Sequence, residues 1–378
     1  MSRKRWVGCD VEAEYLGEDR KHGKMQRKIA LAKDRSKYKK TDRDQLEKQE
    51  KRLRDSETDP ENLLKGRVLS IKPQEILVDH ENDNIVCQLR GVLKKEKSQH
   101  KNLVTVGDFV FFEKNADGTG SIVRVAPRHS VLSRADNLSR RKEQLIAANI
   151  DQVIITTSVV LPPIKSSLVD RYVIATQKGG MSPVIVVNKI DLLNDQSVDP
   201  ILRETEQEIY SEFIAAYEKV GIPVIAASIV TGEGIEKLKA IMKDKASVFS
   251  GQSGVGKSSL INSATGLDLK TGNIVEKTKK GAHTTTTANL MRLSFGGWCI
   301  DTPGIKSFGL WDLKKEDIEP YFDEIHLCGR NCKYPDCSHM LEKGCAVIEA
   351  VEKGEISALR YQSYIFLMDS ISKEHLRR

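Results

Sequence analysis

Two patterns of apolar and polar positions divide the chain. Between residues 63 and 131, five short runs rich in β-branched and aromatic residues are separated by turn residues such as Asn, Asp and Gly. Runs of this length with such boundaries are typical of β-strands. Five strands in so short a stretch suit a small closed barrel, so we predict an OB-fold over residues 63–131.

From about residue 150, apolar runs alternate with amphipathic stretches. The amphipathic stretches carry apolar residues at helical spacing. This alternation predicts an α/β domain over residues 140–307, with a parallel sheet covered by helices on both faces. The apolar runs that we predict to be its strands cover residues 151–159, 182–189, 222–228, 246–251, 288–295 and 297–304.

The two ends of the chain differ from this middle part. Residues 1–62 are highly charged and poor in aromatic residues. We predict that they form an extension without a core of its own, partly helical from about residue 24 to residue 54. At the other end, residues 308–378 lose the strand pattern, and we predict a small, mostly helical C-terminal domain. Its final helical stretch should run from about residue 347 to residue 371.

Composition adds limits on class and location. The chain has 378 residues, of which 39% are hydrophobic and 30% are charged, so it has enough apolar residues for real cores. No run approaches the roughly 18 apolar residues of a membrane span, and the first residues lack the apolar block of a secretory signal. We therefore expect a cytoplasmic protein without a membrane partner, and we expect it to be a monomer.

The net charge of +7 is unevenly spread. Residues 20–43 hold eleven Lys and Arg residues against two acidic ones. Such an excess is typical of a segment that binds a polyanion, because contacts to phosphates release counterions. A solvated helical face or a disordered tail is the alternative that charge alone leaves open.

A glycine-rich pattern predicts a phosphate site. Residues 251–258 fit G-x4-G-K-[ST], after a predicted strand and at the start of a predicted helix. The glycines let backbone N–H groups point at phosphate oxygens, and the helix N-terminus adds positive potential. We expect Lys257 to reach the β- and γ-phosphates and Ser258 to ligate Mg²⁺. The predicted phosphate-binding set is Ser250, Gly251, Gln252, Ser253, Gly254, Val255, Gly256, Lys257 and Ser258.

A second pattern, Asn188-Lys189-Ile190-Asp191, predicts selection of guanine. The Asp191 carboxylate can accept hydrogen bonds from N1–H and the exocyclic amine of guanine, whereas adenine has no donor at N1. A wrong base would leave the carboxylate buried and unpaired. We expect Asn188 to brace the loop and the Lys189 stem to lie over the base. Ser228, after the next strand, should complete the base pocket through its backbone, so GTP is favoured over ATP.

Two further segments supply candidate catalytic groups. Asp301-Thr-Pro-Gly304 ends the last predicted strand, and a segment with four consecutive threonines, 281–287, precedes the strand before it. We expect Asp301 to hold Mg²⁺ through water and the Gly304 N–H to sense the γ-phosphate. Either Thr284 or Thr285 could close on Mg²⁺, and the register of the threonines leaves the choice open.

Ile305 follows Gly304 of the Asp-Thr-Pro-Gly segment, and its aliphatic side chain cannot orient a water molecule. The group that positions the attacking water must therefore come from elsewhere. His283 is our first candidate, and a basic or RNA group from a partner is the alternative.

The order of these segments differs from that of a familiar GTPase. Base motif, base pocket, phosphate loop, threonine segment and Asp-Thr-Pro-Gly follow one another, which is the familiar order after a circular permutation. Such a rotation leaves the sheet intact but places the γ-phosphate-sensing loop directly before the C-terminal segment. We therefore expect nucleotide state to be coupled to that segment.

A cluster of cysteines near the end of the chain predicts a metal site. Cys332, Cys337, His339 and Cys345 offer three thiolates and an imidazole, a donor set that suits one structural Zn²⁺. In a reducing compartment a metal explains such crowding better than disulfides do. Cys328 is a fifth possible ligand, so the choice of four stays open at this point.

The permuted order, the threonine segment, the sequence Ile-Lys-Ser-Phe-Gly-Leu-Trp after Gly304 and the Cys/His cluster together resemble the RsgA (YjeQ-type) GTPases. The resemblance covers residues 64–378. It implies hydrolysis of GTP to GDP and phosphate, stimulated by the small ribosomal subunit late in its maturation, with rRNA contacts from the barrel and the C-terminal domain. It also implies Zn²⁺ on the four Cys/His ligands and Mg²⁺ with GTP.

Two other functions remain to be separated from this one. An RNA-binding assembly factor that holds GTP without turnover would be consistent with Ile305 and with Ala282, where the family usually has Arg. A P-loop kinase is disfavoured, because the Asn-Lys-x-Asp pattern selects guanine and no acceptor pocket or lid is apparent in the sequence.

Overall fold

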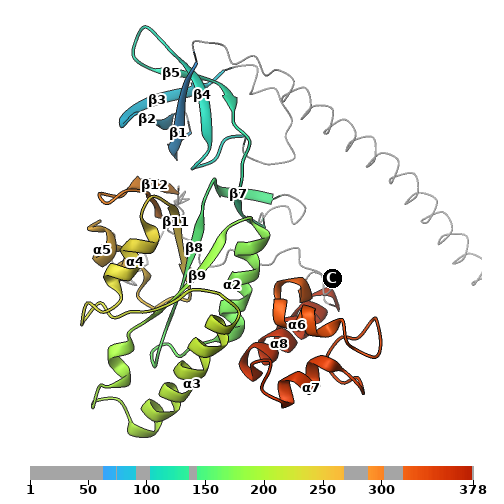
Figure 1. Cartoon of the computed structure of the whole chain (residues 1–378). Coiled ribbons are helices and arrows are strands. Elements are labelled where there is room, and N and C mark those ends of the chain that lie inside the picture. Colours follow the sequence, from blue (N-terminus) through green and yellow to red (C-terminus); the bar gives the residue numbers. More distant parts are fainter. Residues whose placement is uncertain are drawn as a thin grey trace, which may run out of the picture. The chain divides into compact units, whose positions relative to one another are not determined.

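A computed structural model of the chain describes six stretches of residues, all of them after residue 62 (Figure 1). The predicted basic extension, residues 1–62, lies outside the described residues. None of the described helices is long and apolar enough to cross a membrane. The described residues are 63–73, 75–90, 103–135, 143–267, 288–301 and 318–376.

The first five strands form a closed barrel. They hydrogen-bond in the order β1-β2-β3-β5-β4, and β4 returns to pair with β1. Inward-facing side chains such as Val68, Phe112 and Ile122 are fully buried, while the residues between them face outward. The predicted OB-fold is confirmed. Its strands are Leu64–Ile71 (β1), Ile76–His80 (β2), Asp83–Leu89 (β3), Phe109–Lys114 (β4) and Gly120–Val125 (β5).

A short hairpin connects the barrel to the second sheet. It consists of Val131–Ala135 (β6) and Glu143–Ala148 (β7), which pair antiparallel in a separate two-stranded sheet. Leu132 packs into the core of the α/β domain, and the Val131 N–H donates to the Gly179 carbonyl at 3.0 Å. The hairpin is therefore packed against the α/β domain as well as leading into it.

The α/β sheet has the order β10-β9-β8-β11-β13-β12. Its first five strands are parallel, as predicted, but β12 runs antiparallel to β13. The difference has a local cause, since a short turn around Gly296 and Gly297 joins β12 to β13 and can only bring the chain back antiparallel. The strands are Gln152–Ser158 (β8), Ser182–Asn188 (β9), Val224–Ala226 (β10), Ala246–Gly251 (β11), Asn289–Arg292 (β12) and Trp298–Asp301 (β13).

Helices cover both faces of this sheet (Figure 1). Alternate residues of β8 face the two opposite layers of helices. Val153 and Ile155 pack with α2 and α3, whereas Ile154 packs with α4 and α5. Helix α3 begins where the Asp199 carboxylate accepts hydrogen bonds from the N–H groups of its first turn. The helices are Ser166–Lys178 (α2), Pro200–Lys219 (α3), Ile235–Met242 (α4) and Lys257–Thr265 (α5), with a 3₁₀ turn at Ile190–Leu193 (η2).

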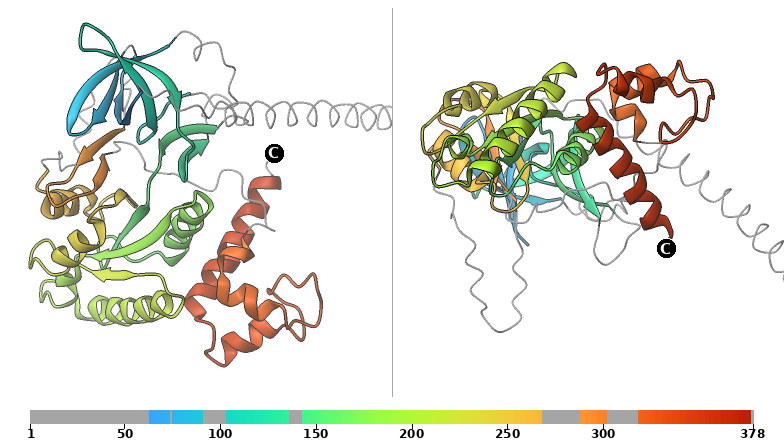
Figure 2. Two further views of the ribbon diagram at one scale, coloured as in Figure 1. Left: turned by 45° about the horizontal axis from the view of Figure 1, so that its top comes forward. Right: turned by 90° about the horizontal axis from the view of Figure 1, so that it is seen from below.

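The C-terminal part is helical (Figure 2), and its helices pack around one core that also includes Ile174 of α2. The predicted helical stretch from 347 to 371 is broken in two, and that prediction was wrong in this respect. Gly354 adopts a φ of 73°, and the N–H groups of Glu355 and Ile356 turn back to the Ala350 carbonyl. The elements are Glu319–Tyr321 (η4), Asp323–Gly329 (α6), Ala346–Glu352 (α7) and Ala358–Leu376 (α8).

One buried arginine joins these helices to the α/β domain. Arg360 of α8 is only 2% exposed, and it pairs with Asp170 of α2 and, at 2.8 Å, with Glu324 of α6. The Tyr217 hydroxyl of α3 donates to Asp170 at 2.9 Å, and the Phe322 ring lies 4.4 Å from the guanidinium. Burial alone would lower the pKa of Arg360, but the two carboxylates raise it above its ordinary value.

We predict that Arg360→Ala destabilises the protein strongly, because it leaves the Asp170 carboxylate buried without its cation. The free energy of unfolding, measured by urea titration, should fall by about 3–5 kcal/mol. Lys353→Ala removes an exposed pair with Glu349 on the same part of the chain and should change it by less than about 1 kcal/mol. Equal, small losses for both variants would contradict this account of the interface.

Candidate nucleotide and metal sites

The phosphate loop connects β11 to α5 in the predicted place. Its backbone uses conformations that favour glycine, with φ of 141° at Gly251 and 91° at Gly256. A Cβ atom on Gly251 would collide with the Thr156 carbonyl of β8, and one on Gly256 would collide with the Asn188 amide. The loop is therefore packed closely against β8 and against the end of β9.

The predicted base motif at the end of β9 contacts this loop directly. The buried Asn188 amide donates to the Val255 carbonyl at 2.8 Å, although the two residues are 67 positions apart. The Lys189 ammonium donates to the Gly254 carbonyl at 2.7 Å and to the Leu161 carbonyl at 2.5 Å. Burial lowers the pKa of Lys189, and the Asp191 carboxylate opposes this in part. The structure thus brings the two predicted nucleotide motifs side by side.

Asp191 lies in the next turn, η2, and is held by Ser228. The Ser228 hydroxyl donates to the Asp191 carboxylate at 2.5 Å and accepts from the N–H groups of Val230 and Thr231 at 3.2 Å each. Ser228 was predicted to act through its backbone, and this side-chain contact was not predicted from the sequence. A cavity of about 350 Å³ opens beside Asp191, lined also by Ile190, Leu193, Asn194, Gln207, Tyr210, Thr231 and Glu233.

Lys257 begins α5 and folds back over the loop. Its ammonium donates to the carbonyls of Gly251 at 2.9 Å and Gln252 at 2.6 Å. Ser258 follows in the first turn of the same helix, where its hydroxyl is a hard oxygen donor. Consecutive residues at the start of this helix thus carry an ammonium and a hydroxyl.

Several predicted catalytic residues lie outside the described residues. These include the candidate water-positioning residue His283, together with Thr284, Thr285 and Gly304. For Asp301 the structure describes the backbone at the end of β13 but not the side chain. Their predicted roles stay predictions.

The cysteine cluster in the C-terminal part is assembled. The ligand atoms of Cys332, Cys337, His339 and Cys345 all lie within 4.8 Å of one another, and Cys328 is outside this group. The sulfur atoms of Cys332 and Cys345 are 3.7 Å apart, and each is 3.5 Å from His339 Nδ1. A tetrahedral site with metal–sulfur bonds of ~2.3 Å has edges of about 3.8 Å, so these separations fit a metal ion.

Further residues hold the loop that carries these ligands, and none of them was predicted from the sequence. The Glu342 carboxylate accepts hydrogen bonds from the Ser338 N–H and hydroxyl and from the N–H groups of Met340 and Leu341. These bonds, led by that of the Ser338 hydroxyl, keep the pKa of Glu342 well below its usual range. The Tyr361 hydroxyl donates to the His339 carbonyl at 2.7 Å. The one signal in the sequence that could have pointed to Glu342 is its position between two of the predicted metal ligands, His339 and Cys345.

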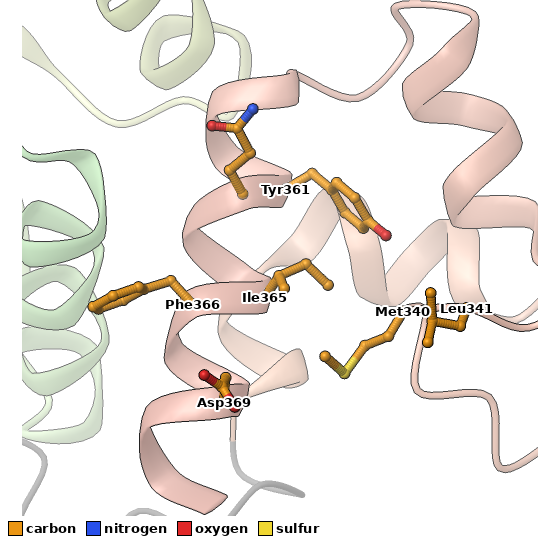
Figure 3. A pocket seen from close by; sticks show the side chains of 7 residues that line it. Met340, Leu341, Tyr361, Ile365, Phe366 and Asp369 are labelled. Atoms are coloured by element: carbon orange, nitrogen blue, oxygen red, sulfur yellow. The ribbon is translucent and has the colours of Figure 1, made fainter. Parts of the chain in front are cut away.

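A larger hollow of about 610 Å³ lies beside this loop. Figure 3 shows Tyr361 and Ile365 of α8 pointing across it toward Met340 and Leu341. Its walls are mainly apolar, and their polar residues are Tyr361, Gln362 and Asp369. None of the lining residues belongs to the predicted nucleotide motifs, so the phosphate loop remains the candidate for GTP chemistry.

Comparisons with known proteins agree with this geometry. The family model described as RsgA GTPase matches residues 125–311. A relative from Chlorobaculum parvum, named small ribosomal subunit biogenesis GTPase RsgA, is 42% identical over 286 residues, which cover 73% of this chain and 88% of the relative.

Two crystal structures are also similar. YjeQ from Thermotoga maritima has a TM-score of 0.65 and 32% identity, covering 82% of this chain and 98% of its own. YloQ, described as a circularly permuted GTPase, has a TM-score of 0.64 and 25% identity, covering 84% of this chain and 98% of its own. The resemblance, the permutation and the predicted fold class are thereby confirmed.

The role of Glu342 can be tested through the metal site. Glu342→Gln keeps the size of the side chain but replaces the carboxylate that accepts these hydrogen bonds, so the loop should lose its fixed shape. We expect the affinity for the bound metal, measured by competition with a chelator, to fall about 10- to 100-fold. Glu349→Gln, on an exposed position of α7, is the matched control and should leave the affinity unchanged. Equal affinities for both variants would contradict this role.

Proposed function

The chain belongs to the RsgA GTPase family, and from this premise we propose that it binds Mg·GTP between its base motif and its phosphate loop and hydrolyses it during maturation of the small ribosomal subunit. The observation that carries the proposal is the pair of contacts from Asn188 and Lys189 to carbonyls of the phosphate loop. They hold the predicted base-reading and phosphate-binding groups at one site.

In this mode of binding, Asp191 accepts the two donors of guanine while Ser228 fixes its carboxylate. The loop N–H groups and Lys257 bind the phosphates, so the ammonium must exchange its carbonyl partners for phosphate oxygens. The Ser258 hydroxyl would hold the Mg²⁺ that accompanies GTP, which would supply positive charge next to the β- and γ-phosphates. Oxygen donors of this kind suit Mg²⁺.

Hydrolysis needs a group that orients water, and Ile305 cannot supply it. We assign that task to His283, whose imidazole can accept a proton or a hydrogen bond from water near neutral pH. Thr284 or Thr285 would complete the magnesium shell, with Asp301 acting through water and the Gly304 N–H on the γ-phosphate.

We infer that the metal in the cysteine cluster is Zn²⁺, one per chain. Three thiols and an imidazole form a closed set of soft and borderline donors, which favours Zn²⁺ over Mg²⁺ or Ca²⁺. Since no position remains for a substrate, the site stabilises the C-terminal domain and takes no part in hydrolysis.

The proposed partner is the small ribosomal subunit with its rRNA, which implies work in the cytoplasm. The outer face of the barrel offers an RNA-binding pattern, because Lys65, Phe111 and Arg124 are cross-strand neighbours on β1, β4 and β5. The Arg124 guanidinium lies 4.2 Å from the Phe111 ring centre. Aromatic and basic side chains side by side on a barrel can stack on bases and contact phosphates. The basic extension, 1–62, would add phosphate contacts, and the domain boundaries at 62, 131, 140 and 307 remain part of this proposal.

Exchange of one atom at Asp191 tests base recognition. Asp191→Asn replaces an acceptor by an NH₂ donor that faces the donors of guanine. The affinity for GDP, measured by calorimetry, should fall on the order of 100-fold, equal to about 2.7 kcal/mol. Xanthosine diphosphate, which presents an oxygen in place of the amine, should bind the variant better than GDP does. Unchanged GDP affinity would mean that Asp191 does not read the base.

Multiple-turnover GTP hydrolysis with and without small subunits tests the proposed activity. The subunits should accelerate hydrolysis, and ATP should not replace GTP. His283→Ala should lower the accelerated rate by at least about 100-fold, because general catalysis of water attack contributes at least that much. Absence of any acceleration would favour the assembly factor without turnover. Normal acceleration in His283→Ala would assign water positioning to the partner.

Two substitutions test the RNA-binding face. Phe111→Ala should weaken subunit binding by about 5- to 150-fold, the loss of one stacked base at ~1–3 kcal/mol. Arg124→Ala should weaken it and reduce the slope of log affinity against log salt by about one. Lys239→Ala removes a lysine of α4 that pairs with Glu236, and it should change neither quantity. Equal affinities for all three variants would place the RNA contacts elsewhere.

A further inference from the structure

Trp298, the first residue of β13, contacts two arginines from different parts of the fold. The guanidinium carbon of Arg292, on the neighbouring strand β12, is 4.9 Å from the indole centre. That of Arg67, on strand β1 of the barrel, is 5.4 Å from it. Both distances are within the range of cation–π contacts. We call Arg67, Trp298 and Arg292 the Trp298 clamp.

Each arginine of the clamp also bonds across the boundary between barrel and α/β domain. Arg67 donates to the Asn149 carbonyl, just before β8, at 2.6 Å. Arg292 lies on the α/β side of the boundary and donates to the Asp79 carboxylate of β2, in the barrel, at 3.0 Å. Asp79 is the cross-strand neighbour of Arg67. The two cations and the ring thus form one connected group that ties the barrel to the hairpin of β12 and β13.

The main chain makes the same connection. Ser70 of β1 pairs with Asn289 of β12, so the hydrogen-bonded sheet of the α/β domain continues into the barrel at this hairpin. Among the described residues the Nε of Arg67 is buried without a hydrogen-bond partner. The Arg67 guanidinium is therefore held by the Asn149 carbonyl and by the rings of Phe109 and Trp298 rather than by a full set of acceptors.

The hairpin joins the two segments to which we assigned nucleotide sensing. Strand β12 begins at Asn289, one residue beyond the threonine segment, 281–287. Strand β13 ends at Asp301, the first residue of the Asp-Thr-Pro-Gly segment. The strands are only four residues long. A displacement of Trp298 at one end of β13 therefore reaches Asp301 at the other, and the antiparallel pairing passes it to β12.

We propose that the Trp298 clamp carries the signal by which RNA bound to the barrel accelerates GTP hydrolysis. Arg67, Trp298 and Arg292 are positioning residues, which act on the reaction through the two segments that the hairpin joins. This inference rests on the proposed function. Because coupling between two binding sites is reciprocal, the nucleotide must also influence the surroundings of Trp298.

Steady-state GTP hydrolysis by the full-length protein, measured at increasing concentrations of small subunits, separates loss of the activating signal from loss of subunit binding. Trp298→Leu removes the aromatic ring and should lower the hydrolysis rate at saturating subunit by about tenfold or more. The subunit concentration that gives half of the maximal rate, and the rate without subunits, should both stay within about twofold of the wild-type values. Trp298→Phe keeps a ring and should restore most of the rate. Arg292→Gln changes a half-exposed side chain and should lower the saturated rate in the same way. It replaces Trp298→Leu in the test if Trp298→Leu folds poorly.

Arg124→Ala is the matched control, because it removes another arginine–aromatic pair from the same barrel away from the hairpin. It should raise the half-saturating concentration and leave the saturated rate unchanged. If Trp298→Leu and Arg292→Gln show this same pattern, or lose stimulated and unstimulated rates equally, the clamp proposal is overturned. If the wild-type protein itself is not stimulated, the proposed function has failed, and this inference fails with it.

Fluorescence provides a readout that does not depend on turnover. The chain has three tryptophans, so Trp6→Phe with Trp311→Phe leaves Trp298 as the only one. Its emission should differ between complexes with GDP and with a non-hydrolysable GTP analogue, and Arg67→Lys should reduce that difference. Identical emission in both complexes would overturn the proposal even where subunit stimulation of the wild type is intact.

Discussion

The contact between the end of β9 and the phosphate loop is the constraint on which the rest of the nucleotide site depends. Asn188 is fully buried and its amide donates to the Val255 carbonyl, while the Lys189 ammonium donates to the adjacent carbonyl of the same loop, that of Gly254. A buried amide without this acceptor would carry a substantial desolvation cost. The loop and the base motif therefore hold each other in place before any nucleotide is bound.

Circular permutation changes what is attached to this site without changing the site. The sheet places β8, β9 and β11 side by side, so the two motifs meet whichever one comes first in the chain. The new chain ends lie elsewhere. One leads through a hairpin to the barrel, and the other follows the Asp-Thr-Pro-Gly segment into the helices of the metal site. Arg360 anchors those helices on α2, so both added parts are bonded to the α/β domain at defined residues.

Local sequence patterns were sufficient to predict the fold, because the spacing of apolar residues differs between strands and helices. The strands of the barrel and of the sheet lie where apolar runs predicted them, and the motifs stand at strand ends, where their chemistry requires them. Two departures have local causes, namely the turn that reverses β12 and the left-handed Gly354 that divides the last helical stretch. The second was readable in principle from a glycine that stands between the charged residues Lys353 and Glu355.

Pairings between distant residues could not be predicted from one sequence. Arg360 and Asp170 are 190 positions apart, and nothing in either segment marks an ion pair. Burial decides such contacts, and burial is a property of the folded chain. The same holds for Ser228 on Asp191 and for the arginines around Trp298. The Cys/His cluster was predictable because its four ligands lie close in sequence, but the carboxylate of Glu342 that supports it carries no spacing pattern.

The central claim is that one guanine nucleotide spans Asp191 and Lys257. A crystal structure with Mg²⁺ and a non-hydrolysable GTP analogue tests it most directly. The account predicts the Asp191 carboxylate within hydrogen-bond distance of guanine N1 and the exocyclic amine, with the Lys257 ammonium moved from its loop carbonyls to phosphate oxygens of the same molecule. A nucleotide bound elsewhere, or one whose base turns away from Asp191 while its phosphates occupy the loop, would contradict it.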